Sequence, residues 1–418
     1  MNRLTRRRFL TNSAAFALAA CLDLPLSAGE GTKARRNRYL IVTPSYYRKR
    51  VQDLSGFAYE RKSPARSEYR CYDLDRTTML TVVNDDGSGL RRFSFPGLFH
   101  SALSSPKHGL IYLSSTYNLA LDAESLEIAA FAPKDPAAGD DRRFGGHGVL
   151  LPGGDAVAFG MNHYRHGKYD SVSIRDARSM KELKQFSSYG FEIHEVRLTP
   201  DAKSLVCGHY GSYLGSNVYH DLAVYDYREG PTPPPKFIYP ASVTFVDLES
   251  GARRALLSDV QGGQEGHVDS DASGNAYLAK HPALVKSRPG VDKNPKFREG
   301  EQTAPDGGEF AYDLEHMGIC VAYEPRHREV IVPKRNSFYL EVTRVDTQEA
   351  RRIDLAEQLD WKTPEGVFIH GLALHPDGKH YVLSTSDGFI ALERGTHRVN
   401  PAMTFRVPLL VHTHLHVV

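Results

Sequence analysis

The sequence predicts an all-β protein, a seven-bladed β-propeller in which N- and C-terminal strands close one blade. Three observations lead to this fold. The periodic segments are short, rich in β-branched and aromatic residues, and bounded by Gly, Pro, Asp and Asn. A degenerate unit recurs at roughly the 40–50-residue spacing of a four-stranded propeller blade. No amphipathic helix of useful length interrupts these units.

Each recurring unit begins with a histidine. An apolar strand follows, then a Pro/Asp/Gly turn, a second apolar strand, and an outer hairpin closed by a D-x-x-[ST]-like turn. The strands predicted within these units include residues 110–116, 156–161, 242–248 and 380–386. The unit starts are His100, His147, His194, His267, His316 and His370.

Both ends of the mature chain supply the seventh blade. Residues 409–418 give one His-led strand and no more, while 38–44, 79–85 and 90–97 give three strands without a unit start. Joining them would remove the open sheet edge that invites aggregation. The domain prediction is therefore one propeller spanning residues 38–418.

The N-terminal segment is typical of an export signal. Residues 1–20 carry four arginines and no acidic residue, and their apolar run is too short to span a membrane. Residues 5–10 (TRRRFL) resemble the bacterial twin-arginine consensus, which predicts a periplasmic protein. Cys21 closes a lipobox-like run and is the candidate lipidation site, with simple cleavage near Ala28 as the alternative. Residues 21–37 then form a tether.

Composition excludes several classes of function. The 418 residues carry a formal charge of +2, so the basic field of a nucleic-acid binder is missing. Four cysteines without CxxC spacing do not make a disulfide scaffold, and Cys207 and Cys320 are expected as small buried side chains. No nucleophile elbow, phosphate-binding loop or HExxH motif is present. Three insertions exceed the repeat and are candidate binding loops: residues 45–72, 209–240 and 280–311.

The placement of the histidines carries the functional prediction. The first strand of each propeller blade lines the central channel, so equivalent blade-start positions form a ring at one channel mouth. Neutral imidazole is a ligand for Cu, Zn, Fe and Ni. The alternative is that each histidine caps its strand with hydrogen bonds. The candidate metal ligands are His100, His147, His194, His267, His316, His370 and His414, the last chosen over His412 and His416.

Other polar residues are secondary candidates. Acidic residues beside the ring could orient imidazole N–H groups or merely decorate loop ends; they are Glu195, Glu265, Asp313 and Glu315. Histidines at turns are expected to be exposed, namely His108, His327, His375 and His380. A separate group on loops could comprise His163, His166, His209 and His220.

Several segments resemble the domain of unknown function family 1513 (DUF1513). They are residues 144–154, 161–177, 190–208, 242–251 and 266–277, and the terminal THLHVV. The resemblance implies twin-arginine export and a quinoprotein-amine-dehydrogenase-like, YVTN-repeat-like seven-bladed propeller. Members are often encoded near periplasmic iron-uptake components, which implies a role in metal handling. The three insertions depart from the family pattern.

The histidine ring alone is similar to the propeller of nitrous-oxide reductase, which holds a copper–sulfide cluster on seven histidines. The present chain stops at Val418 and lacks the cupredoxin domain that admits electrons there. That difference argues against the same reaction.

The functional hypothesis is an exported propeller that binds copper or iron through the histidine ring, for metal acquisition or redox. Its expected partners are the metal ion and a periplasmic electron donor or metal-uptake protein, with membrane contact only through the lipid anchor. The main alternative is a non-enzymatic periplasmic interaction scaffold. A quinoprotein-like or lactonase-like enzyme would need Asp, Glu and Asn where the blade starts offer His. Whether any reaction is catalysed stays open.

Overall fold

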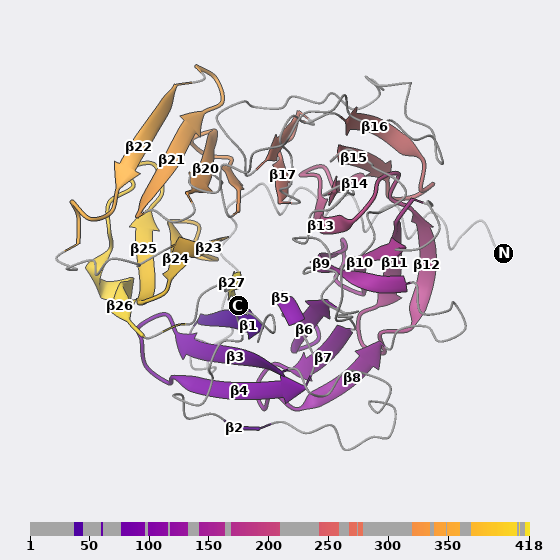
Figure 1. Ribbon diagram of the computed structural model, residues 1–418, viewed down its shortest axis with the longest axis horizontal. Helices are drawn as coiled ribbons and strands as arrows, with labels where there is room; N and C mark the ends of the chain where they lie inside the picture. The colour runs from indigo at the N-terminus through magenta and orange to yellow at the C-terminus, as the bar shows by residue number, and fades with distance from the viewer. Residues whose placement is uncertain are drawn as a thin grey trace, which may run out of the picture.

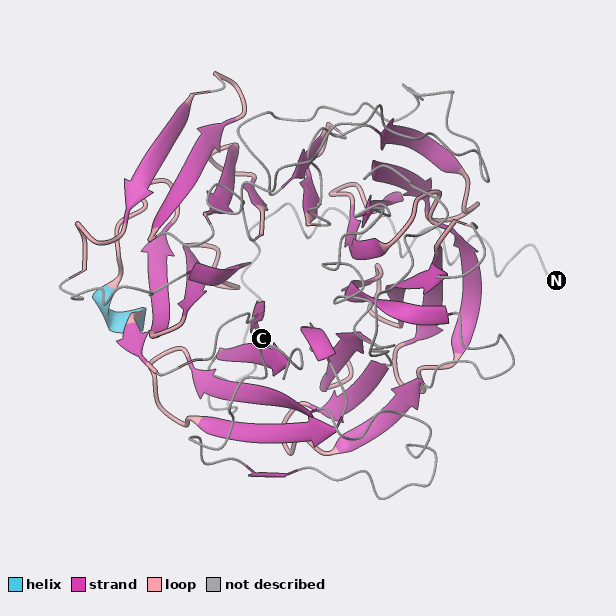
Figure 2. Ribbon diagram, in the orientation of Figure 1, coloured by secondary structure: helices cyan, strands magenta, loops and turns pink. Residues whose placement is uncertain are grey.

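The computed structural model describes residues 37–44, 60–61, 77–96, 99–115, 118–132, 142–163, 169–209, 242–258, 267–273, 275–278, 320–334, 338–347, 349–359, 369–407, 409 and 414–418. These residues form β-sheets arranged around a central axis, as Figure 1 shows. Strands dominate Figure 2, where the one short helix drawn is the 3₁₀ turn Pro401–Met403. The predicted all-β propeller is confirmed.

Most sheets are meanders of four antiparallel strands that run outward from the axis in chain order. The first consists of β5 (Phe99–Ser105), β6 (Leu110–Ser115), β7 (Asn118–Asp122) and β8 (Ile128–Ala132). The second consists of β9 (Arg142–Leu150), β10 (Ala156–His163), β11 (Ser171–Asp176) and β12 (Glu182–Ser187). The third consists of β13 (Ile193–Leu198), β14 (Ser204–His209), β15 (Ser242–Asp247) and β16 (Arg253–Ser258). The fourth consists of β19 (Ala322–Glu324), β20 (Glu329–Pro333), β21 (Tyr339–Arg344) and β22 (Ala350–Asp354). The fifth consists of β23 (Ile369–Leu374), β24 (His380–Thr385), β25 (Gly388–Glu393) and β26 (Phe405–Arg406).

A two-stranded sheet lies between the third and fourth of these meanders in chain order. It pairs β17 (Val268–Ser270) with β18 (Ala276–Leu278) in antiparallel register. Among the described residues, six sheets therefore have the four or more strands of a full blade, and this one has only an inner pair.

The remaining sheet joins the two ends of the chain. Its order is β2 (Glu60–Arg61), β4 (Arg91–Pro96), β3 (Thr77–Asn84), β1 (Arg38–Pro44) and β27 (His414–Val417). The C-terminal strand β27 is innermost and pairs antiparallel with β1, with Leu40 opposite His416. The backbones of Arg38 and Val418 exchange hydrogen bonds of 2.7 and 2.9 Å at the end of this pair. The predicted joining of N- and C-terminal strands in one sheet is found.

The outer hairpins close as the sequence indicates. Asp122, Asp176 and Asp247 each end the third strand of a sheet. Each accepts hydrogen bonds from the backbone N–H groups two and three residues further along and from a serine hydroxyl. These Asx turns satisfy the backbone donors where the chain reverses. The D-x-x-S pattern thus fixes where each outer strand begins.

The hydrophobic core is divided among the interfaces between neighbouring sheets. Phe144 and Phe159 of one sheet pack with Tyr112 of the sheet before it, and Ile193 and Cys207 pack with Val172 in the same way. Leu415 of β27 packs with Tyr39 and with Phe389 of the last meander. Because each sheet is buried on both faces, the inner strands are held rigidly around the axis. None of the helices in the described part of the chain is long and apolar enough to cross a membrane.

The three long insertions fall almost wholly outside the described residues, as do the export segment, Cys21 and the tether.

Candidate metal centre

A β-bulge presents the histidine in three of the inner strands. The pairing of β5 with β6 skips His100, that of β13 with β14 skips His194, and that of β23 with β24 skips His370. In each case the histidine is the single extra residue between two regular pairs. A bulge bends its strand and re-aims the side chain of the extra residue, and bulges are common beside functional sites. The recurring histidine therefore coincides with a recurring backbone irregularity.

His147 reaches the same region through a wider irregularity. The register of β9 against β10 jumps from Gly148 opposite Phe159 to Phe144 opposite Met161. Gly146 lies within this segment, and a Cβ there would stand 2.7 Å from Cδ2 of His100 and 2.8 Å from Cε1 of His194. Only glycine permits such an approach, so Gly146 makes room for the two neighbouring rings.

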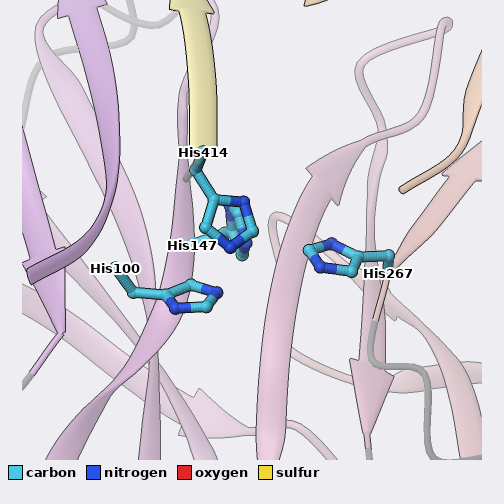
Figure 3. A group of neighbouring side chains, drawn as sticks. All are labelled: His100, His147, His267 and His414. Atoms are coloured by element: carbon cyan, nitrogen blue, oxygen red, sulfur yellow. The ribbon is translucent and has the colours of Figure 1, made fainter. Parts of the chain in front are cut away.

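Four histidines from four different sheets converge near the axis. His100, His147, His267 and His414 each offer a ring nitrogen, and these nitrogens all lie within 4.8 Å of one another. Figure 3 shows the four rings grouped together, with His100 and His267 on opposite sides of the pair formed by His147 and His414. His267 directly precedes β17, and His414 is the first residue of β27.

His194 belongs to the same cluster. Its Nε2 lies 3.3 Å from Nε2 of His100 and 3.3 Å from Nε2 of His267. Four of the rings form a cycle of contacts, measured between ring centroids. The distances are 4.7 Å for His100–His194, 4.7 Å for His194–His267, 5.5 Å for His267–His414 and 4.0 Å for His414–His100. His147 contacts all four members of that cycle at 4.9–5.0 Å. Four rings in a cycle with a fifth against each of them is the connectivity of a square pyramid.

The environment disfavours the charged form of three of these rings. Burial lowers the pKa of His147, His194 and His414 well below 6.5, and neighbouring cluster histidines lower it further. His147 is 6% exposed, and His194 and His267 are similarly buried. Neutral imidazoles retain a lone pair for a metal ion.

One carboxylate anchors the cluster. Oε2 of Glu195 lies 3.0 Å from Nδ1 of His267 and accepts a 3.0 Å hydrogen bond from the backbone N–H of Val268. Its Oε1 accepts from Nε of Arg197 at 2.6 Å, and Nη2 of Arg197 is also 2.6 Å away. Burial by itself would raise the pKa of Glu195, but Arg197 and the His267 hydrogen bond outweigh it and lower the pKa to about 2. Glu195 is therefore ionised.

The structure brings together five of the seven candidate ligands. His370 has the corresponding bulge position and is buried, but it is not a member of the four-nitrogen group. His316 lies outside the described residues, as does His412. Of the C-terminal candidates, His414 joins the group, whereas His416 stands two residues further along β27. Glu265, Asp313 and Glu315 also lie outside the described residues.

The expectation that the turn histidines are exposed is wrong for His375, which is 3% exposed, and also for His108 and His380, whose side chains are 5% and 12% exposed. Nδ1 of His375 lies 3.1 Å from Asp377, and Nδ1 of His380 lies 2.6 Å from the same carboxylate. These three residues form a second group that has ligand atoms within 4.8 Å of one another. Asp377 also accepts backbone hydrogen bonds from Lys379 and His380, so the group closes the β23–β24 turn. His327 is exposed as expected.

His209 likewise departs from its predicted place on a loop. It ends β14 and is 1% exposed, with its ring nitrogens 3.2 Å from the carbonyl oxygen of Ser242 and 3.0 Å from Oγ of Ser188. The His209 ring therefore pairs with two buried polar groups, the carbonyl of Ser242 and the hydroxyl of Ser188. Cys207 is fully buried on the same strand, as expected, while Cys320 is half-buried.

The donor set fits a transition metal. Nitrogens on opposite sides of one ion at ~2.1 Å are ~4.2 Å apart, so nitrogens within 4.8 Å need to contract by less than ~1 Å to share one ion. A donor set made of imidazole nitrogens suits copper, iron, zinc or nickel and does not suit the hard cations Ca²⁺ and Mg²⁺, which prefer oxygen.

No known family model matches the chain, and no curated protein matches it.

Proposed function

We propose that this protein is an exported propeller that binds one transition-metal ion, copper or iron, through the histidine cluster on its axis. The observation that supports this proposal is the convergence of five imidazoles from five sheets. The ring nitrogens of four of them lie within 4.8 Å of one another, and Nε2 of the fifth, His194, lies 3.3 Å from Nε2 of both His100 and His267. Strand capping, the competing explanation, needs each histidine to bond to its own or a neighbouring strand and gives no reason for the rings to meet.

The spacing favours a single ion over a cluster of ions. Nε2 of His194 is 3.3 Å from Nε2 of both His100 and His267, a distance typical of two ligands on one ion. The site would thus differ from the copper–sulfide cluster of nitrous-oxide reductase. Its task would be metal acquisition or a redox step served by a periplasmic electron donor or metal-uptake partner.

Three further proposals give the site its setting. The β17–β18 pair is the inner half of a seventh blade, completing a seven-bladed ring over residues 38–418. Residues 1–20 direct twin-arginine export, and Cys21 carries a lipid that tethers the protein to the membrane through residues 21–37. The resemblance to family 1513 implies the seven-bladed propeller and the twin-arginine export.

Metal analysis of protein purified from its native export route tests the proposal. We expect close to one equivalent of copper or iron per wild-type chain. His147→Ala and His194→Ala should each weaken metal binding by on the order of 100-fold or more, because loss of a direct ligand exceeds the 10–100-fold cost of losing an outer hydrogen-bond partner. His327→Ala is the matched control, since that exposed histidine lies on a turn away from the cluster.

An apo-protein that takes up neither copper nor iron would overturn the proposal. The same holds if the two cluster variants bind metal as tightly as His327→Ala.

A further inference from the structure

We infer that Glu195 is the positioning residue of the centre: it holds the proton of His267 on Nδ1 and so presets Nε2 of that ring as a metal donor. The inference rests on the proposed function, because a donor needs an ion to serve. It assigns a role to the Glu195–Arg197 pair, which supplies no ligand of its own.

The Glu195 carboxylate contacts both the His267 ring and the backbone of the next residue. Oε2 of Glu195 is 3.0 Å from the ring Nδ1 and 3.0 Å from the backbone nitrogen of Val268, the next residue. Glu195 belongs to β13, whereas His267 enters the neighbouring two-stranded sheet. One oxygen therefore fixes both the ring and its backbone across the sheet boundary.

Oε2 of Glu195 already accepts from the Val268 N–H and Oε1 faces the Arg197 guanidinium, so both oxygens act as acceptors and Nδ1 of His267 is the donor. In the neutral imidazole that a metal ion requires, the single N–H is then on Nδ1 and Nε2 keeps its lone pair. That Nε2 lies 3.3 Å from Nε2 of His194, on the side of the ring that faces the cluster. A carboxylate on the remote nitrogen also makes the ligating nitrogen more basic.

Arg197 keeps the other oxygen of Glu195 an acceptor. Nε and Nη2 of its guanidinium both lie against Oε1, so N–H donors face both carboxylate oxygens. A glutamine at position 195 offers one oxygen and one NH₂ group. The NH₂ would have to face either the Arg197 guanidinium or the His267 and Val268 donors, so one side of the anchor must break.

The chain offers a control built from the same three residue types elsewhere. Glu329 is buried, with one oxygen 2.9 Å from Nη2 of Arg351 and the other 3.0 Å from Nε2 of His397. This Glu–Arg–His trio lies between the last two meanders, outside the cluster. Glu329→Gln therefore removes a buried paired carboxylate without touching the proposed donors.

The first experiment needs no metal. Long-range ¹H–¹⁵N NMR of the metal-free protein at pH 7.5 reports which nitrogen of His267 carries the proton. We expect Nδ1–H in wild type and in Glu329→Gln, and a mixed or Nε2–H population in Glu195→Gln. Finding His267 as the Nε2–H tautomer in wild type would overturn the inference.

The second experiment measures Cu²⁺ affinity by competition with a chelator, together with the EPR spectrum of the bound ion. Glu195→Gln should weaken binding 10–100-fold and shift the copper hyperfine splitting, and Glu195→Asp, which keeps the charge, should restore part of the affinity. Glu329→Gln should leave affinity and spectrum at wild-type values even where it lowers Tm.

The two proposals fail in different ways. Wild-type protein that binds neither copper nor iron contradicts the metal function itself. Wild-type protein that binds copper, while Glu195→Gln matches Glu329→Gln in affinity and spectrum, contradicts only the role of Glu195.

Discussion

At the scale of the residue, the cluster depends on a position that has no side chain. The rings of His100 and His194 approach each other across Gly146, where any Cβ would lie within 2.9 Å of both. Contacts this short do not occur between real side chains, so a larger residue must displace the rings or the backbone. The glycine acts on the proposed site through geometry alone.

We expect Gly146→Ala to weaken copper or iron binding by at least tenfold, because the two rings must separate to admit the methyl group. Gly160→Ala is the control. Its Cβ would stand 2.9 Å from Cγ2 of Ile193, an equally crowded position against an aliphatic side chain. Similar losses of stability, as urea midpoints, with a loss of metal affinity in Gly146→Ala alone would support the assignment. Equal affinities in the two variants would count against it.

At the scale of the element, a β-bulge at a histidine recurs in three inner strands of the propeller. Short runs rich in β-branched and aromatic residues, bounded by turn signals, predict β6, β10, β15 and β24 to within about two residues, because strands buried on both faces read as nearly continuous apolar runs. The bulges at His100, His194 and His370 could not be predicted in this way. An extra residue in one strand is defined by its partner strand, and the partner is known only once the chain has folded.

Strand β27 completes both a sheet and the cluster. Leu415 is buried against Tyr39 and Phe389, directly beside His414. We expect Leu415→Ala to cost ~2–5 kcal/mol of unfolding free energy, through lost burial and the cavity left behind. The exposed Leu183 provides the control, since Leu183→Ala should stay within ~0.5 kcal/mol of wild type. Urea denaturation of the metal-free proteins measures both. A cost below ~1 kcal/mol for Leu415→Ala would mean that β27 is not an integral strand.

At the scale of the whole molecule, the histidines separate into two groups that composition cannot distinguish. Five meet on the axis, whereas His209 and His397 are buried between strands and bonded to neighbours. The one-per-unit spacing identified the axial group because equivalent positions in a closed ring converge. The buried turn and strand-end histidines have no such repeat, so the sequence pattern contains no sign of their burial.

The interior histidines make the fold sensitive to acid. Burial lowers the pKa of His209 to about 4, and burial together with Arg351 and His327 lowers that of His397 to about 4. As the pH falls below ~6.5, the unfolded chain binds these protons while the folded chain does not. Stability is therefore complete above ~6.5 and declines down to about pH 4, by up to ~1.4 kcal/mol per pH unit for each group.

Urea midpoints of the metal-free protein should accordingly be flat from pH 8 to 7 and fall from pH 6.5 to 5. His209→Gln should reduce the slope by ~1.4 kcal/mol per pH unit, because the substituted side chain does not titrate. A stability that holds steady between pH 6.5 and 5 would contradict this account.

The innermost strand of the closing sheet is also the last described strand that the ribosome makes. His100, His147, His194 and His267 are all synthesised well before His414 and β27. Earlier sheets can fold during synthesis, but the axial cluster gains its fifth ring only after the rest of the described chain has been made. A nascent or C-terminally truncated chain would thus have at most an incomplete centre. If the protein is exported in the folded state, as proposed, the cluster would be complete before export, and a metal ion bound there would be selected in the compartment of synthesis.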